Sequence, residues 1–300
     1  MFDNVPERLT EYLRGAVVDF DRESFYYFAA AFVSLFYLGK DFTNPKTSDF
    51  LNIRRSIRGG IWWGHSGRVI IIGETLFLMR SAPGFSEFCR RLSGRDLRST
   101  YFEIYVARMF IEGGYEVCAR PEVGVRGEDY DFQASREGQT VNVEVTALTP
   151  DQFSPQNVEN ALHHKRKQLP DTEPSIIFCV LPESWSETPM GAPLGKLTKK
   201  FFGNTRRVSA VVYVIEKHVE FEKDGPVGQL SIQHLCLLHP NPRRPISSLS
   251  FLSDAWETDT GQTDSPTQRR DNEFFQWADS IFMSKEEAHA TRKSQITDEE

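Results

Sequence analysis

The stretch EDYDFQASREGQTVNVEVTAL, residues 128–148, decides the fold of this chain. In its second half Val141, Val143 and Val145 alternate with polar residues, and this period of two predicts a β-strand with one apolar face. Phe132 and Ala134 alternate in the same way in the first half. A Glu-Gly pair between the two runs suits a two-residue hairpin turn. The stretch therefore predicts a β-hairpin.

Two carboxylates fall on the polar face of this hairpin. If the turn is centred on Glu137 and Gly138, the numbers of paired residues add up to 275, and Asp131 lies opposite Glu144. Like charges that face each other in a sheet are destabilising. Three explanations stay open: a solvated face, one protonated carboxyl group, or a divalent cation between the two. Mg²⁺ in particular takes carboxylate oxygens as ligands.

The helix predicted after the hairpin, over 156–169, carries a lysine on its apolar side. Val158 and Leu162 begin a stripe at helical spacing, and Lys165 falls in the middle of it, with Gln168 on its edge. A buried lysine needs an anionic partner or must extend to water. The carboxylates of the hairpin are the obvious partner for Lys165.

The helix predicted before the hairpin, over 95–112, shows the same anomaly with an acid. It ends at a Gly-Gly pair, which is typical of a helix C-terminus. Glu103 shares its apolar face with Val106 and Phe110, although charged residues are rarely buried unpaired. The residues expected on the wetter side are Tyr101, Tyr105, Arg108 and Glu112. Three acids and one lysine thus converge, which predicts a functional site.

The order of elements after residue 94 is that of an α/β fold: a helix, three strands, a helix, a buried strand, a helix and two strands. We expect these elements to occupy 93–240. The residues before them, 1–92, are expected to be mostly helical. The residues after them, 241–300, are expected to form a polar linker, a late helix and a tail.

The charge of the chain excludes a strongly basic surface. The chain has 300 residues and a net charge of −7, and residues 253–300 alone hold 12 acidic and 5 basic residues. The acidic excess therefore lies in the last segment, and the rest of the chain is neutral overall. Local clusters of basic residues must carry any binding to a polyanion.

The remaining composition indicates a cytoplasmic protein without a membrane segment. The four cysteines are widely spaced and form no Cys-x-x-Cys pair, which argues against a zinc site and fits a reducing compartment. The N-terminus has acidic residues and no apolar core typical of a signal peptide. The apolar run at 25–39 is too short to predict a membrane span.

Taken in order, these features resemble the PD-(D/E)XK nuclease superfamily and its restriction-endonuclease-like fold, a mixed central sheet flanked by helices. The resemblance covers roughly residues 95–240. Glu103 matches the acid of the family's first helix, Asp131 its metal-binding aspartate, and Glu144 the acid of its Glu-x-Lys motif. Where that motif has lysine, this sequence has Thr146.

Members of the superfamily exist in which the lysine has moved to the neighbouring helix. Lys165 fits such a migration, and Gln168 fits a glutamine that is common on that helix. Without a migrated lysine the resemblance implies a site that has lost its activity.

The resemblance implies an endonuclease that depends on Mg²⁺ or Mn²⁺ and hydrolyses phosphodiester bonds. Asp131, Glu144 and the Val145 carbonyl would hold the ion, Glu103 would hold a second ion or its waters, and Lys165 would act on the nucleophile or the developing charge. The expected partner is nucleic acid, with DNA as the first choice, no membrane, and a homodimer as one option. The candidates for contacts with phosphates are Arg120, Arg126, Arg136 and the run 196–207.

Two other interpretations stay open. A relative without catalytic activity could bind nucleic acid or a protein partner through the same fold. A structural protein could hold the same charges as a buried ion network without metal.

Overall fold

The structure is a computed structural model, and the chain divides into two compact units. The first unit comprises Met1–Asn52, His65–Ser81 and Asp264–Glu300, and the second comprises Ile53–Gly64 and Ala82–Thr263. The structure describes residues 7–8, 10–11, 13, 21–43, 50–51, 63–149, 152–185, 190–221, 227–246 and 272–284, without the side chains at 23, 63–65 and 217–231.

The first unit is helical in the part of it that the structure describes. Its helices are α2 (Arg22–Leu38), α3 (Trp63–Met79) and a helix at 273–284. Asp21 caps the N-terminus of α2, because its side chain accepts a hydrogen bond from the Ser24 amide at 2.8 Å. The late helix joins the same unit through Asp279, which accepts a 2.5 Å hydrogen bond from the Tyr26 hydroxyl of α2.

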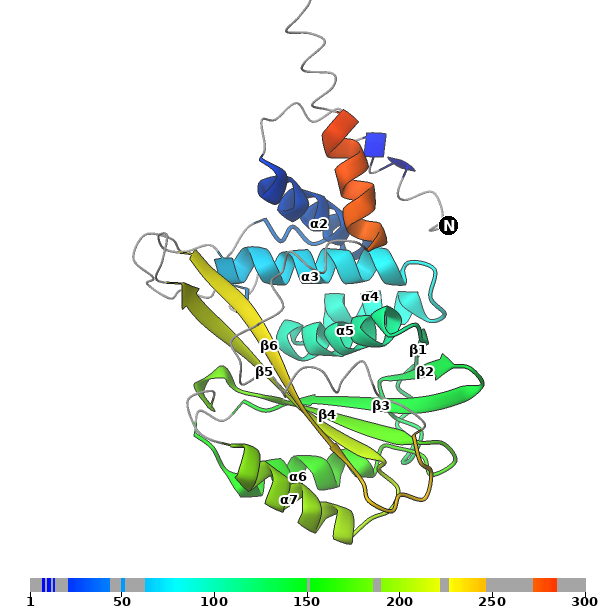
Figure 1. The fold of residues 1–300 in the computed structure, drawn as a ribbon. Coiled ribbons are helices and arrows are strands. Elements are labelled where there is room, and N and C mark those ends of the chain that lie inside the picture. The colour runs from blue at the N-terminus through cyan, green and yellow to red at the C-terminus, as the bar shows by residue number, and fades with distance from the viewer. Residues whose placement is uncertain are drawn as a thin grey trace, which may run out of the picture. The chain divides into compact units, whose positions relative to one another are not determined.

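The second unit is built on a six-stranded sheet with the strand order β1-β2-β3-β4-β5-β6 (Figure 1). The first three strands are antiparallel, β3, β4 and β5 are parallel, and β6 is antiparallel to β5. The sheet is therefore mixed. The strands are β1 (Glu116–Ala119), β2 (Phe132–Arg136), β3 (Gln139–Ala147), β4 (Ser175–Leu181), β5 (Ala210–Phe221) and β6 (Val227–Leu238).

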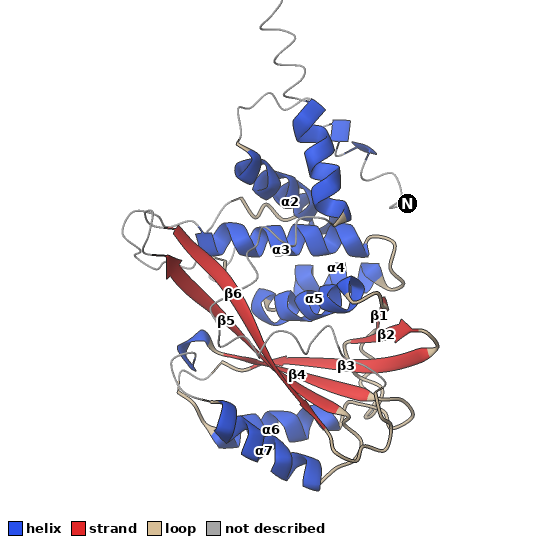
Figure 2. Cartoon of the chain, in the orientation of Figure 1, coloured by secondary structure: helices blue, strands red, loops and turns tan. Residues whose placement is uncertain are grey.

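Helices flank this sheet on both faces, which confirms the predicted fold class. Figure 2 shows α4 (Phe85–Gly94) and α5 (Leu97–Glu112) on one face, and α6 (Pro155–Arg166) and α7 (Gly191–Gly203) on the other. On the first face, the Phe110 ring of α5 contacts the Phe132 and Phe178 rings. A short 3₁₀ helix, η2 (Glu183–Trp185), precedes α7.

The hairpin of β2 and β3 has the predicted register. Gln133 pairs with Asn142, so the paired numbers add up to 275, and their side chains share a 3.0 Å hydrogen bond on one face of the sheet. Glu137 and Gly138 form the turn with φ of 51° and 79°. A two-residue hairpin turn with two positive φ angles matches the right-handed twist of the strands, which explains why Glu-Gly works here.

Two local expectations need correction. The first strand of the hairpin, β2, begins at Phe132, so Asp131 precedes it. The helix expected to end at 169 ends at Arg166, because Pro170 disfavours the helical conformation for the residue before it.

Of the four residues expected on the wetter side of α5, Tyr101, Tyr105 and Arg108 are buried, and Glu112 is exposed as expected. Tyr101 and Tyr105 are 0% and 3% exposed, because the long strands β5 and β6 reach them. The Tyr101 hydroxyl donates to Glu216 of β5 at 3.2 Å, and the Tyr105 ring stacks on His234 of β6. Helix α5 is thus enclosed by elements that follow it by more than 100 residues in the sequence.

Candidate active site

The ammonium group of Lys165 on α6 forms an ion pair with the carboxylate Oε1 of Glu144 on β3. The Glu144 side chain is 1% exposed and that of Lys165 is 21% exposed. Glu144 is placed on the α6 face by strand alternation, since its sheet neighbour Ile177 packs with Leu162 of α6 in one apolar cluster. The lysine on the apolar stripe therefore has the anionic partner that its burial requires.

Asp131 lies at a bend just before β2 and is fixed from several sides. Its amide donates to the Val143 carbonyl at 3.2 Å, and its carboxylate Oδ2 accepts from the Val145 amide at 2.7 Å. Its own carbonyl accepts from the Arg120 amide at 3.0 Å. Because Asp131 is outside the regular strand, it is not an in-register partner of Glu144; instead its side chain reaches the backbone next to Glu144.

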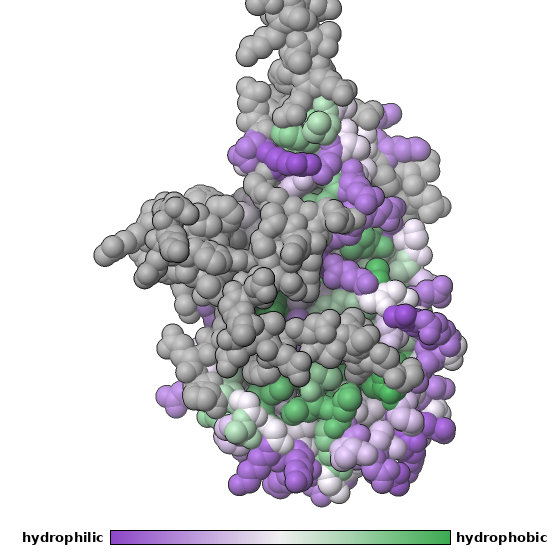
Figure 3. All heavy atoms as spheres, in the orientation of Figure 1, coloured by the Kyte–Doolittle hydropathy of each residue, from purple (hydrophilic) through white to green (hydrophobic). Residues whose placement is uncertain are grey.

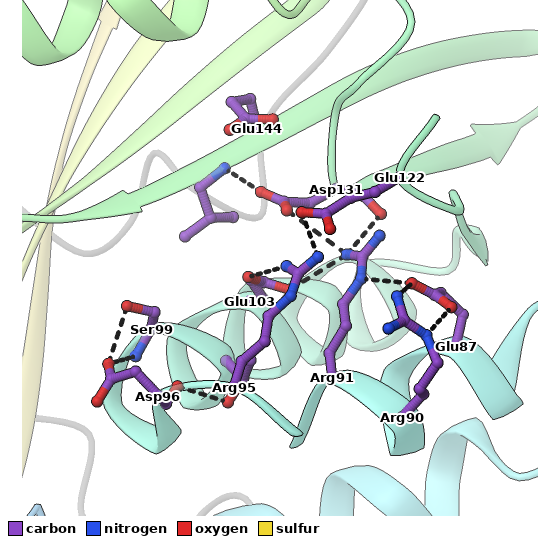
Figure 4. Close-up of polar contacts among 12 residues, drawn as sticks. Glu87, Arg90, Arg91, Arg95, Asp96, Ser99, Glu103, Glu122, Asp131 and Glu144 are labelled. Carbon is purple, nitrogen blue, oxygen red and sulfur yellow. Dashed lines mark hydrogen bonds and ion pairs between the residues drawn. The ribbon is translucent and has the colours of Figure 1, made fainter. Parts of the chain in front are cut away.

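Arg91 on α4 is a buried cation among these acids. Its side chain is 1% exposed, and its guanidinium contacts Glu103 Oε2 at 3.2 Å, Asp131 Oδ1 at 3.5 Å and the Asp131 carbonyl at 3.1 Å. It also donates to Glu87 at 3.0 Å and to the Arg120 carbonyl. Figure 4 shows Arg91 reaching from α4 towards Asp131, with Glu103 beside it and Glu144 beyond Asp131.

Glu103 of α5 is paired with two arginines. Besides Arg91, the Arg95 guanidinium lies 3.7 Å from Glu103 Oε1 and also forms an ion pair with Glu122. Glu103 is 6% exposed, as expected from its place on the apolar face of α5. The predicted inward acid is thus confirmed as buried, and its partners are two arginines of the preceding helix and turn.

The pKa values of the three acids are shifted upwards. Burial raises the pKa of Glu103 to about 7, and the charge of Asp131 acts in the same direction. Burial, followed by the charge of Asp131, raises the pKa of Glu144 well above its usual range. Burial also raises the pKa of Asp131, against the opposing charge of Lys165. The acids therefore repel one another in a desolvated place, and a further cation would be favoured there.

The pKa of Lys165 shows the opposite balance. Burial alone would lower it, but the charges of Glu144 and Asp131 outweigh burial and raise it. Lys165 is therefore an ammonium cation at neutral pH, as a group that stabilises negative charge must be.

Gln168 contacts the segment that leads to Asp131. Its side-chain amide donates to the Asp129 carbonyl at 3.1 Å, and its backbone carbonyl accepts from the Asp129 amide at 3.3 Å. The other atom of its side-chain amide, Oε1, is buried and has no hydrogen-bond partner among the residues that the structure describes. Gln168 is thus hydrogen-bonded twice to the backbone of Asp129, two residues before Asp131.

The arginines that were expected to grip phosphates differ in their surroundings. The Arg120 guanidinium lies over the Tyr130 ring at 5.7 Å, and Arg136 pairs with Glu137 at 3.1 Å at the tip of the hairpin. Arg126 is exposed in the loop between β1 and β2. The run 196–207 divides between α7 and the turn that follows it.

The site offers oxygen ligands, and one of them is free. Glu144 Oε2 is buried without a hydrogen-bond partner in the described part of the chain. An orphaned carboxylate oxygen beside a second carboxylate suits a hard cation such as Mg²⁺. Within the same residues, no group of three or more His, Cys, Asp or Glu side chains is arranged to hold a metal ion. The donor set therefore fits an ion held by Asp131 and Glu144 better than one that also takes Glu103.

Arg91 was missed by the sequence analysis, although a signal for it exists. Phe85, Phe88 and Leu92 form the apolar stripe of α4, and Arg91 follows Phe88 by three residues on the same side of the helix. This is the same anomaly that singled out Lys165. Arg95, in contrast, lies beyond the end of α4, where helical spacing gives no guide.

Comparisons with known proteins add little to this geometry. The sequence matches no protein-family model and no curated protein. Among solved structures it matches SfsA of Pyrococcus furiosus in complex with Ca²⁺, at 13% identity and a TM-score of 0.25. The match covers 45% of this chain and 62% of that chain, which is less than two thirds of its length. The likeness to SfsA is weak.

None of the helices in the described ranges is long and apolar enough to cross a membrane.

Proposed function

We propose that this chain is a nuclease of the PD-(D/E)XK type that hydrolyses phosphodiester bonds in DNA with the help of Mg²⁺ or Mn²⁺. The observation that carries the proposal is the ion pair of Lys165 with Glu144. Thr146 follows Glu144 by two residues on the same side of β3, and Lys165 brings from α6 the charge that Thr146 lacks.

Asp131 and Glu144 are the residues that would hold the divalent ion, with the Val145 carbonyl as a third ligand. The free Glu144 Oε2 supports this assignment. When bound, such an ion supplies a Lewis acid for a phosphoryl oxygen and lowers the pKa of a water molecule.

The residues of the chain have separate tasks in this proposal. The Lys165 ammonium stabilises the negative charge that develops on the phosphoryl group. The Val145 amide holds the Asp131 carboxylate through the 2.7 Å hydrogen bond, which restricts its rotation. Gln168 holds the backbone two residues earlier at Asp129. These contacts keep the carboxylates in place before substrate binds.

A polyanionic substrate is supported by a basic surface near this site. The segments that follow α6, α7 and β6 meet there. The Arg206 guanidinium donates to the Asn241 carbonyl at 3.0 Å, and the Arg243 amide donates to the Arg206 carbonyl at 2.7 Å. Arg207 donates to the Leu169 carbonyl at 3.3 Å. We call the cations of these segments the basic surface: Arg166, Lys167, Arg206, Arg207, Arg243 and Arg244.

The basic surface keeps an excess of positive charge. Asp171 pairs with Arg243 at 2.5 Å and lies 3.8 Å from Arg207, and Glu173 is the other acid of the same loop. In Figure 3 hydrophilic residues lie along the lower edge of the molecule, and hydrophobic residues are exposed above them. Arg207 of the basic surface contacts Leu169, and the neighbouring residue Gln168 contacts Asp129, two residues before Asp131. A nucleic-acid backbone bound to the basic surface would therefore extend towards Asp131.

A second function, binding of nucleic acid without hydrolysis, is favoured by one observation. Arg91 and Lys165 already place positive charge against the three acids, so part of their negative charge is compensated without metal. A protein with such a site could retain the fold and the basic surface and cleave nothing.

Incubation with supercoiled plasmid in Mg²⁺, Mn²⁺ or EDTA tests the proposal. We expect nicked and linear DNA with either ion, none in EDTA, and none with the Asp131→Asn variant. A mobility shift of the plasmid without cleavage in any metal would favour the binding protein. Neither cleavage nor a shift would reject both functions.

A further inference from the structure

Each nitrogen of the Arg91 guanidinium donates hydrogen bonds to residues in or next to the candidate site. Its three nitrogens donate to five acceptors on four residues: Glu87, Glu103, Arg120 and Asp131, the last through both its carbonyl and its carboxylate. A guanidinium remains protonated at all relevant pH values and has a rigid planar set of donors. Arg91 is therefore a fixed positive charge in the site.

Most carboxylate oxygens of Glu103 and Glu144 contact a cation of the chain, and one has no partner in the described residues. Both oxygens of Glu103 face arginines, Oε2 at 3.2 Å from Arg91 and Oε1 at 3.7 Å from Arg95. Glu144 is different, because Lys165 takes its Oε1 while Oε2 has no partner in the described residues. The capacity to bind a further cation is thus at Glu144, on the side of Asp131 away from Glu103 (Figure 4).

We infer that the site takes a single divalent ion, and that the guanidinium of Arg91 occupies the place beside Glu103 and Asp131 that a second ion would need. The inference rests on the proposed function, since it specifies the metal content of that same site. Two-metal phosphodiesterases place a second ion about 4 Å from the first. Here a second dication between Glu103 and Asp131 would meet Arg91 at hydrogen-bond distance from both carboxylates.

The number of Mn²⁺ ions bound by the full-length chain tests this inference without a measurement of activity. Titration calorimetry, with free Mn²⁺ followed by its electron paramagnetic resonance signal, gives the stoichiometry. We expect one ion per chain for the wild type. Two ions in the wild type would overturn the inference while leaving the proposed function intact, whereas no binding at all would overturn the proposed function.

Variants of the two neighbouring arginines separate charge from structure. Arg91→Gln removes the fixed charge, and we expect a second Mn²⁺ to bind; Arg91→Lys keeps a charge, and we expect one. Arg90→Gln is the matched control with one ion, because the Arg90 side chain is 60% exposed and forms its ion pair with Glu87, outside the three acids of the site. A folded Arg91→Gln protein that still binds one ion would overturn the inference.

Glu103→Gln provides a second route if Arg91→Gln does not fold, as judged by circular dichroism. Glu103 is committed to arginines in this inference, so the Glu103→Gln variant is expected to bind one Mn²⁺ with the affinity of the wild type. Asp131→Asn is expected to lose that ion. Loss of Mn²⁺ binding in Glu103→Gln would show Glu103 to be a ligand and would overturn the inference.

Discussion

Lys165 and Glu144 come from different elements, 21 residues apart in the chain, and form a partly buried ion pair in which the carboxylate is the buried partner. The sheet and α6 enclose Glu144, so its carboxylate is almost inaccessible to solvent. Removing one partner of such a pair leaves an uncompensated buried charge. The same pair therefore compensates the buried Glu144 carboxylate and supplies the lysine on which the proposed chemistry depends.

Replacement of Lys165 by methionine keeps the aliphatic stem and removes the charge. We expect the cleavage rate to fall by about 10²–10³-fold, the usual loss for one contact that stabilises transition-state charge. Lys199→Met is the control, because Lys199 is exposed on α7 and is not part of the basic surface. Initial rates of plasmid nicking measure both. Equal rates for Lys165→Met and wild type would reject the role of Lys165.

The position of Thr146 allows a rescue experiment. Thr146 is two residues from Glu144 on β3, so a side chain at 146 points to the same face. We expect Thr146→Lys to restore part of the nicking rate in the Lys165→Met background. Thr146→Met in the same background is the uncharged control and should restore nothing. A rescue by methionine would mean that packing, and not charge, had been lost.

Stability without metal should depend on pH through Glu103. Its pKa is raised by burial from 4.5 to about 7, so between these values the folded state binds more protons than the unfolded state. The free energy of unfolding therefore falls as pH rises through this window, by up to about 3.5 kcal/mol at about 1.4 kcal/mol per pKa unit. Urea denaturation in EDTA at a series of pH values measures this slope. Glu103→Gln should make it shallower, with the raised pKa values of Asp131 and Glu144 still contributing, and an unchanged slope would contradict the assignment to Glu103.

Metal should stabilise the fold through Asp131 and Glu144. An ion that binds only the folded state raises the free energy of unfolding by about 2.7 kcal/mol at 100 times its Kd. We expect Mg²⁺ to raise the Tm of the wild type, and Asp131→Asn or Glu144→Gln to abolish the increase. Thermal scans with and without EDTA provide the measurement. A shift that survives both substitutions would place the ion elsewhere.

The basic surface should determine how strongly DNA binding depends on salt. Arg206→Glu and Arg243→Glu should weaken binding of a DNA duplex, and each lost phosphate contact should reduce the log–log salt slope by about 0.9. Lys196→Glu is the control, since Lys196 is exposed in the first half of α7 while Arg206 lies beyond its end. Fluorescence anisotropy at several salt concentrations measures the slope. Equal slopes in all three variants would exclude this surface.

Much of the second unit follows from local patterns in the sequence. The period of two in β3 and the Glu-Gly turn determine the hairpin register, because both act between neighbouring residues. Lys165 could be identified for a similar reason. Its place on an apolar stripe is a local fact, and burial of a charge demands an anion wherever the helix packs.

Other features depend on contacts that local patterns do not encode. The enclosure of α5 requires β5 and β6, whose residues follow Tyr101 and Tyr105 by 115 and 129 positions. The bend at Asp131 places its side chain on the Val145 amide, although strict alternation would have continued β2 through it.

The sequence by itself determined the order of elements, the hairpin register and the inward charges of Glu103, Glu144 and Lys165, because each depends on spacing within a short stretch of chain. Only the tertiary structure decided which cations compensate Glu103 and Asp131 on the side of α4. Arg91 meets Asp131 across 40 residues of chain and Glu103 across a turn between two helices. Such a meeting depends on how α4 and α5 pack against the sheet, and charge attraction chooses among partners only after packing has brought them together and removed the water between them.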